Sequence, residues 1–379
     1  MSELVVDTML RETRVLVCCG SGGVGKTTTA AALGLLAAQR GRSVLVMTID
    51  PAKRLAQSMG LDDLGHEPQR IVVESVPGSL SAMMLDTKHT FDALIEKYAP
   101  NETVKQTIFA NSYYQHLSTS LMGSREFMAM EKVYEMTTGD PTGKRFDLVI
   151  VDTPPSEHAL DFLDAPRRLF ELFEGSFVNL LLQPYRLAGR IGFDLFRRSS
   201  DRFLKVFEKL TGYEVLADLS DFFLAFSGMF DGFKDRSRHV GEILRRADTR
   251  FLLVCAPEPT SLAQADRFFA RLASERLPIG GLIVNRVHRS FGEVPPELSA
   301  NEAAFVGSLP DGRIEGRSLM DRLLSAHRDL SMLAHADAAA IAGTAVAQGV
   351  PSAHVPRFDR DLASMEDLAA FAAALTVDQ

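Results

Sequence analysis

Residues 18–30 read CCGSGGVGKTTTA, a glycine-dense run followed by a lysine and three threonines. Within it, residues 20–27 fit the pattern G-x-x-x-x-G-K-[ST]. The apolar residues 14–19 predict a buried strand before this loop, and the Ala- and Leu-rich run after it, closed by Gly41, predicts a helix. Glycines let backbone N–H groups surround phosphate oxygens, and the helix N-terminus adds partial positive charge. The stretch therefore predicts a phosphate-binding loop, and the alternative is a plain tight turn.

Two side chains of this loop have expected roles at a nucleoside triphosphate. Lys26 is expected on the β- and γ-phosphates, and the hydroxyl of Thr27 on Mg²⁺. A second motif, DLVIVDTPP at residues 147–155, places Asp152 at the carboxyl end of an apolar strand. A carboxylate at this edge of an α/β sheet can hold Mg²⁺. Asp152 is therefore the second predicted metal ligand, with an ordinary helix cap as the alternative role.

A third motif, TIDPAKRLAQ at residues 48–57, also places an aspartate at the end of a strand. The carboxylate of Asp50 is suited to orienting a water molecule for in-line attack on the γ-phosphate, which makes Asp50 the predicted catalytic carboxylate beside Lys26. Because Pro51 follows and suits the first position of a helix, the alternative role for Asp50 is a helix N-cap.

Apolar runs alternate with helical segments along much of the chain. Continuous apolar strands joined through helices indicate a parallel sheet that is covered on both faces. The predicted fold class is therefore α/β, a P-loop NTPase with a mostly parallel sheet flanked by helices. The runs after the first strand are 43–50, 80–86, 146–152, 251–256 and 279–285.

Two long stretches interrupt this alternation. Residues 88–138 have helical character without an intervening strand, and residues 165–245 hold 12 of the chain's 24 phenylalanines. We predict a P-loop domain of residues 1–164 and 246–379 with a Phe-rich helical insert at 165–245. Phenylalanine and leucine at helical spacing usually form an ordinary helical core, and the alternative is an apolar groove for a hydrophobic helix.

Composition limits the class of protein. The net charge of −8 argues against general nucleic-acid binding, and three cysteines cannot build a disulfide framework. The N-terminus lacks the features of a signal peptide, and no run reaches the roughly 18 apolar residues of a membrane span. We therefore expect a cytoplasmic protein, either free or peripheral to the membrane. The acidic amphipathic tail is expected to pack on the body of the protein.

Four motifs carry a family resemblance: GSGGVGKTTTA, TIDPAKRLAQ, VDTPPSEHALDFL and GLIVNRV. In this order and spacing they resemble the ArsA family of P-loop ATPases, which includes the arsenite-pump ATPase and the ATPase that targets tail-anchored membrane proteins. Within that family the chain is similar to actinobacterial anion-transporting ATPase homologues. More loosely, it resembles the ParA and MinD division ATPases, which share this kind of phosphate loop.

The resemblance implies an ATP-driven dimer and assigns roles to individual residues. It implies that Asp50 activates water in a first switch segment and that Asp152 begins a second one. Asn285 would read the adenine, and the region of Val355 and Pro356 would close over the base. The residues implied to cradle phosphates and magnesium are Gly22, Gly23, Val24, Gly25, Lys26, Thr27 and Thr28. The second switch segment would run from Asp152 through Thr153, Pro154, Pro155 and His158.

The chain departs from the family pattern at residue 21. The family loop usually reads G-K-G-G-V-G-K-[ST], and its first lysine reaches the ATP of the partner subunit. Here Ser21 occupies that position and carries no charge. Loss of a cation from a phosphoryl-transfer site could cost several kcal/mol of transition-state stabilisation. Another residue compensates, or the chain hydrolyses ATP slowly, or a lysine-bearing paralogue completes the site in a heterodimer instead of a homodimer.

The sequence gives little support for a site that binds zinc or another soft metal through cysteine or histidine. The zinc-binding C-x-x-C of eukaryotic targeting members is absent, and Cys18 and Cys19 are adjacent in the first strand. With Cys255 they read as buried apolar residues of core strands. The nine histidines show no ligand spacing, so no metal other than Mg²⁺ is expected.

Three functions remain as hypotheses. The first is an ATP-switched dimer that binds or delivers a hydrophobic, membrane-protein-like client. The second is the ATPase subunit of a metalloid or anion efflux pump, which the positions of the cysteines oppose. The third is a positioning ATPase like ParA or MinD, which the acidic balance and the long insert oppose.

Overall fold

The computed structural model describes residues 2–154, 222–292 and 316–376, with short gaps at 51, 75, 140–145 and within 113–123 and 224–228. The described residues form an eight-stranded sheet in the order β3-β4-β2-β5-β1-β6-β7-β8. All neighbouring strands pair in parallel except β3 and β4, which are antiparallel. The predicted α/β fold with a mostly parallel sheet is confirmed.

Six strands lie where apolar runs predict them. They are β1 (Val15–Cys19), β2 (Ser43–Thr48), β4 (Ser79–Met84), β5 (Leu148–Asp152), β6 (Thr249–Cys255) and β7 (Ile279–Val287). The sequence did not predict β3 (Gln69–Ile71) or β8 (Ser352–Pro356), the two edge strands. β3 has three residues, two of them exposed, and β8 contains a histidine and a proline, so neither has the apolar run of a central strand.

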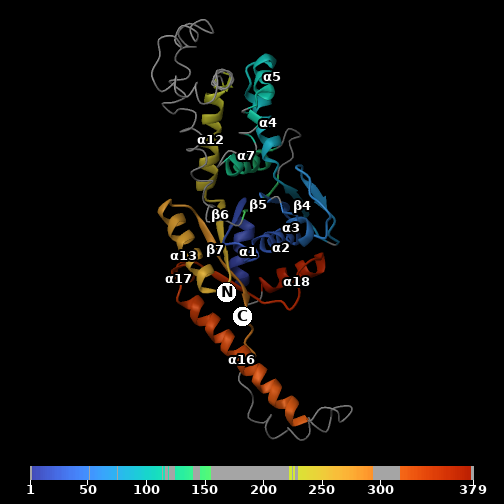
Figure 1. Ribbon diagram of the computed structural model, residues 1–379, viewed down its shortest axis with the longest axis vertical. Coiled ribbons are helices and arrows are strands. Elements are labelled where there is room, and N and C mark those ends of the chain that lie inside the picture. Colours follow the sequence, from blue (N-terminus) through green and yellow to red (C-terminus); the bar gives the residue numbers. More distant parts are fainter. Residues whose placement is uncertain are drawn as a thin grey trace, which may run out of the picture.

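Helices cover both faces of the sheet, as Figure 1 shows. Successive residues of β1 alternate between two cores: Val15, Val17 and Cys19 face one, and Leu16 and Cys18 face the other. The core with Leu16 includes α1 (Ser2–Glu12), α2 (Lys26–Gln39), α3 (Arg54–Ser58) and α18 (Met365–Ala374). The core with Val15 includes α4 (Thr87–Tyr98), α7 (Ser124–Thr138), α12 (Phe230–Arg245) and α13 (Pro259–Ser274).

Helices extend beyond the sheet at both ends of the molecule. In Figure 1, α4, α5 (Glu102–Ala110) and α12 project at one end, and the long α16 (Gly316–Ala342) projects at the other. The short α17 (Ala345–Gly349) follows α16 and leads into β8. No helix within the described ranges combines the length and apolarity that crossing a bilayer requires.

Only one end of the Phe-rich stretch lies within the described residues. Phe222, Phe223 and Phe226 are buried there, and the rings of Phe226 and Phe91 have centroids 6.3 Å apart. This end therefore packs against α4 and joins the same core as the sheet. Most of residues 165–245 lies outside the described ranges, so the domain boundaries at 164/165 and 245/246 stay predictions.

The C-terminal helix packs on the body, as its amphipathic pattern predicts. Ser364 caps α18 by accepting the backbone N–H of Asp367 at 3.1 Å, and Leu368 and Phe371 are buried against the α2 side of the sheet. The acidic residues at its start suit the positive end of the helix dipole.

Gly34 in α2 packs closely on the sheet. A Cβ at Gly34 would lie 2.5 Å from Cγ2 of Val46 and 3.1 Å from Cδ1 of Leu80. We expect Gly34→Ala to lower the free energy of unfolding by about 1–3 kcal/mol, because overpacking of stiff strand side chains exceeds the gain in helix propensity. Urea unfolding measures the change.

Gly241 in α12 is the matched control, because a Cβ there would meet only Arg245 Nη1 at 3.6 Å, an ordinary contact. Gly241→Ala should raise the free energy of unfolding by about 0.5–1 kcal/mol. Equal effects of the two substitutions would contradict the packing argument.

Candidate functional site

The glycine-dense loop lies at the carboxyl end of β1, where α2 begins. Gly25, the residue before α2, has a left-handed backbone with φ 96°. A Cβ at Gly25 would overlap the side-chain amide nitrogen of Asn285, and a Cβ at Gly20 would overlap the carbonyl oxygen of Val254. The loop is therefore held against the ends of β6 and β7 so closely that both positions need glycine.

Lys26 is folded back onto this loop. Its Nζ donates a hydrogen bond to the carbonyl oxygen of Ser21 at 2.8 Å, and the residue is only 6% exposed. Burial lowers the pKa of Lys26 below its usual value, and the nearby carboxylate of Asp152 acts in the opposite direction. The acceptor of this hydrogen bond is a neutral carbonyl, so the ammonium group can exchange it for an anionic phosphate oxygen.

Two strand ends and the first turn of α2 bring oxygen atoms together beside the loop. Asp152 Oδ2 accepts hydrogen bonds from the hydroxyls of Thr27 at 2.8 Å and Thr48 at 3.0 Å. Thr48 is the parallel partner of Asp152 in the pairing of β2 with β5. The other oxygen, Oδ1, is buried and has no hydrogen-bond partner. Burial raises the pKa of Asp152 to about 6, although both threonine hydroxyls and Lys26 favour its ionised form.

The Thr27 and Asp152 oxygens fit the predicted magnesium site. Mg²⁺ takes hard oxygen ligands and keeps several waters, so one hydroxyl and one carboxylate are a normal protein contribution. The unpartnered Asp152 Oδ1 supplies the open acceptor that such an ion uses. The sequence prediction did not include Thr48. The signal that would have found it is its place at the end of the strand beside Asp152, with a short polar side chain.

Asp50 lies two residues beyond the end of β2. Its Oδ1 accepts the backbone N–H of Ala52 at 3.0 Å, and its own N–H donates to the Thr48 hydroxyl at 3.2 Å. The Asp50 side chain therefore stabilises the turn that follows β2. Because α3 starts only at Arg54, Asp50 is not the N-cap of that helix. Thr48 connects Asp50 to Asp152 through hydrogen bonds. The role of Asp50 with water stays a prediction.

Asn285 and Pro356 lie at the same edge of the sheet, on β7 and β8. The side-chain amide of Asn285 donates to the Val24 carbonyl at 2.8 Å, and its Oδ1 accepts the N–H of Arg286 at 2.9 Å. Pro356 pairs in register with Val287. Asn285 therefore supports the phosphate loop directly, and the predicted adenine contacts of both residues stay predictions.

The second switch segment is described only at its start. The hydroxyl of Thr153 donates to the carbonyl oxygen of Cys18 at 2.8 Å, which joins the end of β5 to β1. The predicted positions Pro155 and His158 lie outside the described residues. Backbone contacts of Gly22, Gly23 and Thr28 with phosphate likewise stay predictions.

Similarity to known proteins shows the family to which this chain belongs. The family described as Anion-transporting ATPase (ArsA ATPase) matches residues 13–291, well over half of the chain. This chain belongs to the ArsA ATPase family. It is an α/β ATPase of that family, and the family implies nucleotide binding.

Individual relatives are distant. The chain is 26% identical over 272 residues to the "ATPase get3" of Schizosaccharomyces japonicus, covering 71% of this chain and 72% of that protein. It is 27% identical over 279 residues to the "ATPase get3" of Neurospora crassa, covering 73% and 74%. It is 26% identical over 275 residues to an "ATPase ASNA1 homolog" of Babesia bovis, covering 71% and 64%.

Ser21, where an ArsA-like loop usually has lysine, contacts its own chain. Its Oγ lies 3.2 Å from Oγ of Ser261 at the start of α13, and Ser261 Oγ also accepts the backbone N–H of Ala256 at 3.0 Å. The sequence prediction did not include Ser261, and no pattern in the chain points to it. The two serines join the phosphate loop to the beginning of α13.

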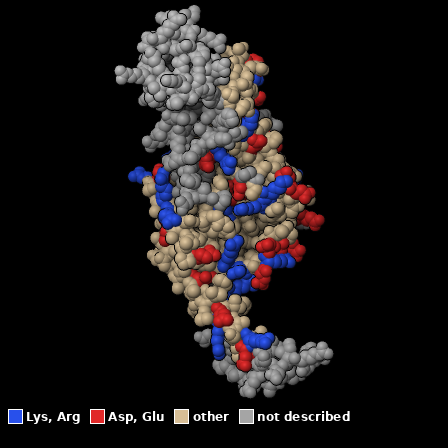
Figure 2. Space-filling model, in the orientation of Figure 1, with Lys and Arg blue, Asp and Glu red and all other residues tan. Residues whose placement is uncertain are grey.

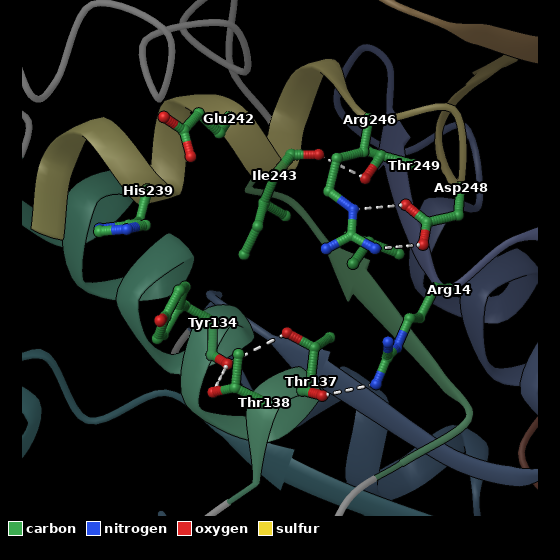
Figure 3. Close-up of a pocket in the computed structure, with 11 residues that line it drawn as sticks. Arg14, Tyr134, Thr137, Thr138, His239, Glu242, Ile243, Arg246, Asp248 and Thr249 are labelled. Atoms are coloured by element: carbon green, nitrogen blue, oxygen red, sulfur yellow. Dashed lines mark hydrogen bonds and ion pairs between the residues drawn. The ribbon is translucent and has the colours of Figure 1, made fainter.

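A cavity of about 230 Å³ opens at the other end of the same strands. It is lined by Arg14 and Val15 at the start of β1, together with residues of α7 and α12 (Figure 3). Its arginines already have partners: Arg14 donates to the Thr137 carbonyl at 2.7 Å, and Arg246 pairs with Asp248 at 2.9 and 2.8 Å. Because the phosphate loop follows the carboxyl end of β1, this cavity is separate from the nucleotide site.

The raised pKa of Asp152 has a consequence for stability without nucleotide or magnesium. An Asp whose pKa is higher in the folded state costs stability when it ionises, so the cost is absent below about pH 4 and complete above about pH 6. We expect Asp152→Asn to raise the free energy of unfolding at pH 8 by up to about 3 kcal/mol. The gain should shrink as the pH falls from 6 to 4.

Urea unfolding in chelator-containing buffer at pH 8 and at pH 4.5 measures this difference. The comparison between pH values is its own control, because both measurements use the same pair of proteins. A variant that is less stable than the natural chain at pH 8 would contradict the burial argument.

Proposed function

We propose that this ATPase is a Mg²⁺-dependent, ATP-switched dimer that binds a hydrophobic, membrane-protein-like client in the cytoplasm or at the membrane surface. The observation that carries the nucleotide part is the contact of Thr27 and Thr48 with Asp152 directly beside the phosphate loop. Proteins of the ArsA family are typically dimeric, and this supports a dimer here.

Each residue of the site has a separate role in binding or hydrolysing ATP. Lys26 exchanges its carbonyl partner for phosphate oxygens, and bound Mg²⁺ would neutralise negative charge on those oxygens. Asp50, held by the Thr48 hydroxyl and the Ala52 N–H, orients the attacking water. The Thr48 hydroxyl contacts both Asp50 and Asp152, so it links the proposed water-orienting group to the proposed metal ligand.

The client part of the proposal depends on the Phe-rich stretch. Residues 165–245 occupy the position at which the targeting members of the resembled family carry a helical subdomain for a hydrophobic client, and Phe predominates there. The relatives named "ATPase get3" support the targeting branch of the family over the pump branch. An apolar helix is the client chemistry that such a surface recognises.

The structure gives two observations against the other functions. Cys18 and Cys19 face opposite cores of the sheet, and burial raises the pKa of Cys19 and of Cys255 to about 12, so converging thiolates for arsenite do not form. On the described part of the face in Figure 2, basic and acidic side chains are interspersed, with no continuous basic stripe for DNA or anionic lipid.

Two substitutions test the site and the switch. We expect Lys26→Ala and Asp50→Asn each to lower the steady-state rate of Mg-ATP hydrolysis by about 100-fold or more, because each removes stabilisation of the transition state. Both should also lose ATP-dependent binding of a fluorescent apolar helical peptide. Lys97→Ala, an exposed lysine on α4, is the control and should match the natural chain.

Thermal melting shows whether each variant is folded, and Asp50→Asn is the milder change. Natural rates of hydrolysis in both variants would overturn the assigned site. A monomer under all nucleotide conditions would overturn the dimer, and intact ATPase activity without peptide binding would overturn the client alone.

Ser21 bears on whether the chain pairs with an identical subunit or with a lysine-bearing paralogue. We propose that the chain binds ATP but turns over slowly alone, because an identical partner carries serine instead of lysine at position 21. Ser21→Lys should raise the rate of hydrolysis by about 10- to 100-fold, increasingly at high protein concentration. Ser21→Ala, which removes only the contact with Ser261, should not raise it. A high rate in the natural chain that rises with its concentration would instead establish a working homodimer.

A further inference from the structure

Two histidines and a glutamate lie together on the surface, away from the nucleotide site. His66 and Glu67 belong to the segment between α3 and β3, and His89 belongs to the first turn of α4. One potential ligand atom from each of the three residues lies within 4.8 Å of the other two, and all three side chains are exposed. The histidines are 23 positions apart in the chain, so no short spacing marks them in the sequence.

Backbone contacts fix the two segments that carry these residues. The N–H of Met84 at the end of β4 donates to the Gly65 carbonyl at 2.9 Å, which holds the loop beside the strand. Asp86 caps α4 by accepting the N–H of His89 at 2.9 Å. The imidazole rings of His66 and His89 consequently have centroids only 4.3 Å apart, with planes at 50°.

Glu67 forms an ion pair with Lys132, which also pairs with a second glutamate. Lys132 Nζ on α7 lies 3.7 Å from Glu67 Oε1 and 3.3 Å from Glu135 Oε2. Because Glu135 is the closer partner, Glu67 can turn a carboxylate oxygen toward a third group without leaving the lysine unpaired. Glu67 can therefore take part in a site with the two histidines.

We propose that His66, Glu67 and His89 bind one divalent transition-metal ion, with zinc as the best match. Two imidazole nitrogens and one carboxylate oxygen form a donor set that zinc prefers, and magnesium and calcium prefer oxygen alone. Tetrahedral zinc with bonds of about 2.0–2.1 Å needs ligand atoms roughly 3.4 Å apart. The ligand atoms now lie within 4.8 Å of one another, and because all three side chains are exposed they can rotate toward that value. The fourth position faces solvent and takes water.

The ion would brace a segment that leads toward the nucleotide site. Asp63, three residues before His66, pairs with Lys53 at 3.2 Å, and Lys53 follows Asp50 by three residues. Leu85 at the end of β4 also donates its N–H to the Thr48 carbonyl at 2.9 Å. Metal binding would therefore link the loop to α4, and the Lys53–Asp63 pair already links this loop to the segment after β2. The inference is independent of the proposed client and of the magnesium site.

Isothermal titration with Zn²⁺ tests this inference. The protein used is the chain described here, after a chelator has removed bound metal. We expect one equivalent to bind, a higher melting temperature with zinc, and Co²⁺ to give the visible absorption of a tetrahedral site. His66→Ala and His89→Ala should each weaken zinc binding by about tenfold or more, and Glu67→Gln should also weaken it. His335→Ala, an exposed histidine on α16, is the control and should bind as the natural chain does.

Added MgCl2 should not displace the zinc, because the donor set disfavours magnesium. All three ligands are exposed, so the variants should keep the melting temperature of the metal-free natural chain. No zinc binding by the natural chain would overturn the inference. Unchanged binding by both His66→Ala and His89→Ala would also overturn it, because the ion would then lie elsewhere.

Discussion

The structure of the nucleotide edge depends on one buried carboxylate. Asp152 sits at the end of β5, between β1 and β2 in the sheet, and receives hydroxyl hydrogen bonds from Thr27 and Thr48. These hydrogen bonds tie the first turn of α2 and the end of β2 to the same oxygen. The other oxygen remains unpartnered in a buried position, which is costly in a free protein and useful for a cation.

A second feature follows from the close packing around this edge. Gly20 and Gly25 let the loop approach Val254 and Asn285, which belong to β6 and β7. Asn285 also holds the Val24 carbonyl. The conformation of the phosphate loop therefore depends on its contacts with β6 and β7 as well as on its own glycines. Asn285, the expected base-binding residue, is hydrogen-bonded directly to this loop.

The central part of the fold could be predicted from the sequence because its physical signals are local. Six buried strands have continuous apolar runs, and Lys26, Thr27 and Asp152 follow directly from motif and position. The edge strands β3 and β8 could not be found, because an edge strand buries too little surface to need an apolar run. Thr48, Ser261 and the pair His66 and His89 were missed for a different reason. Their partners are distant in the chain, and only the register of the sheet and the path of the loops bring them together.

All three cysteines of the chain lie in two neighbouring central strands, β1 and β6, and all three are buried. Burial raises the pKa of each thiol, so very little of the reactive thiolate exists in the folded protein at neutral pH. A thiol-directed reagent can therefore reach them only after the centre of the sheet has opened. The three cysteines can thus report global unfolding without any substitution. The rate at which a thiol reagent labels them would measure how often the sheet opens.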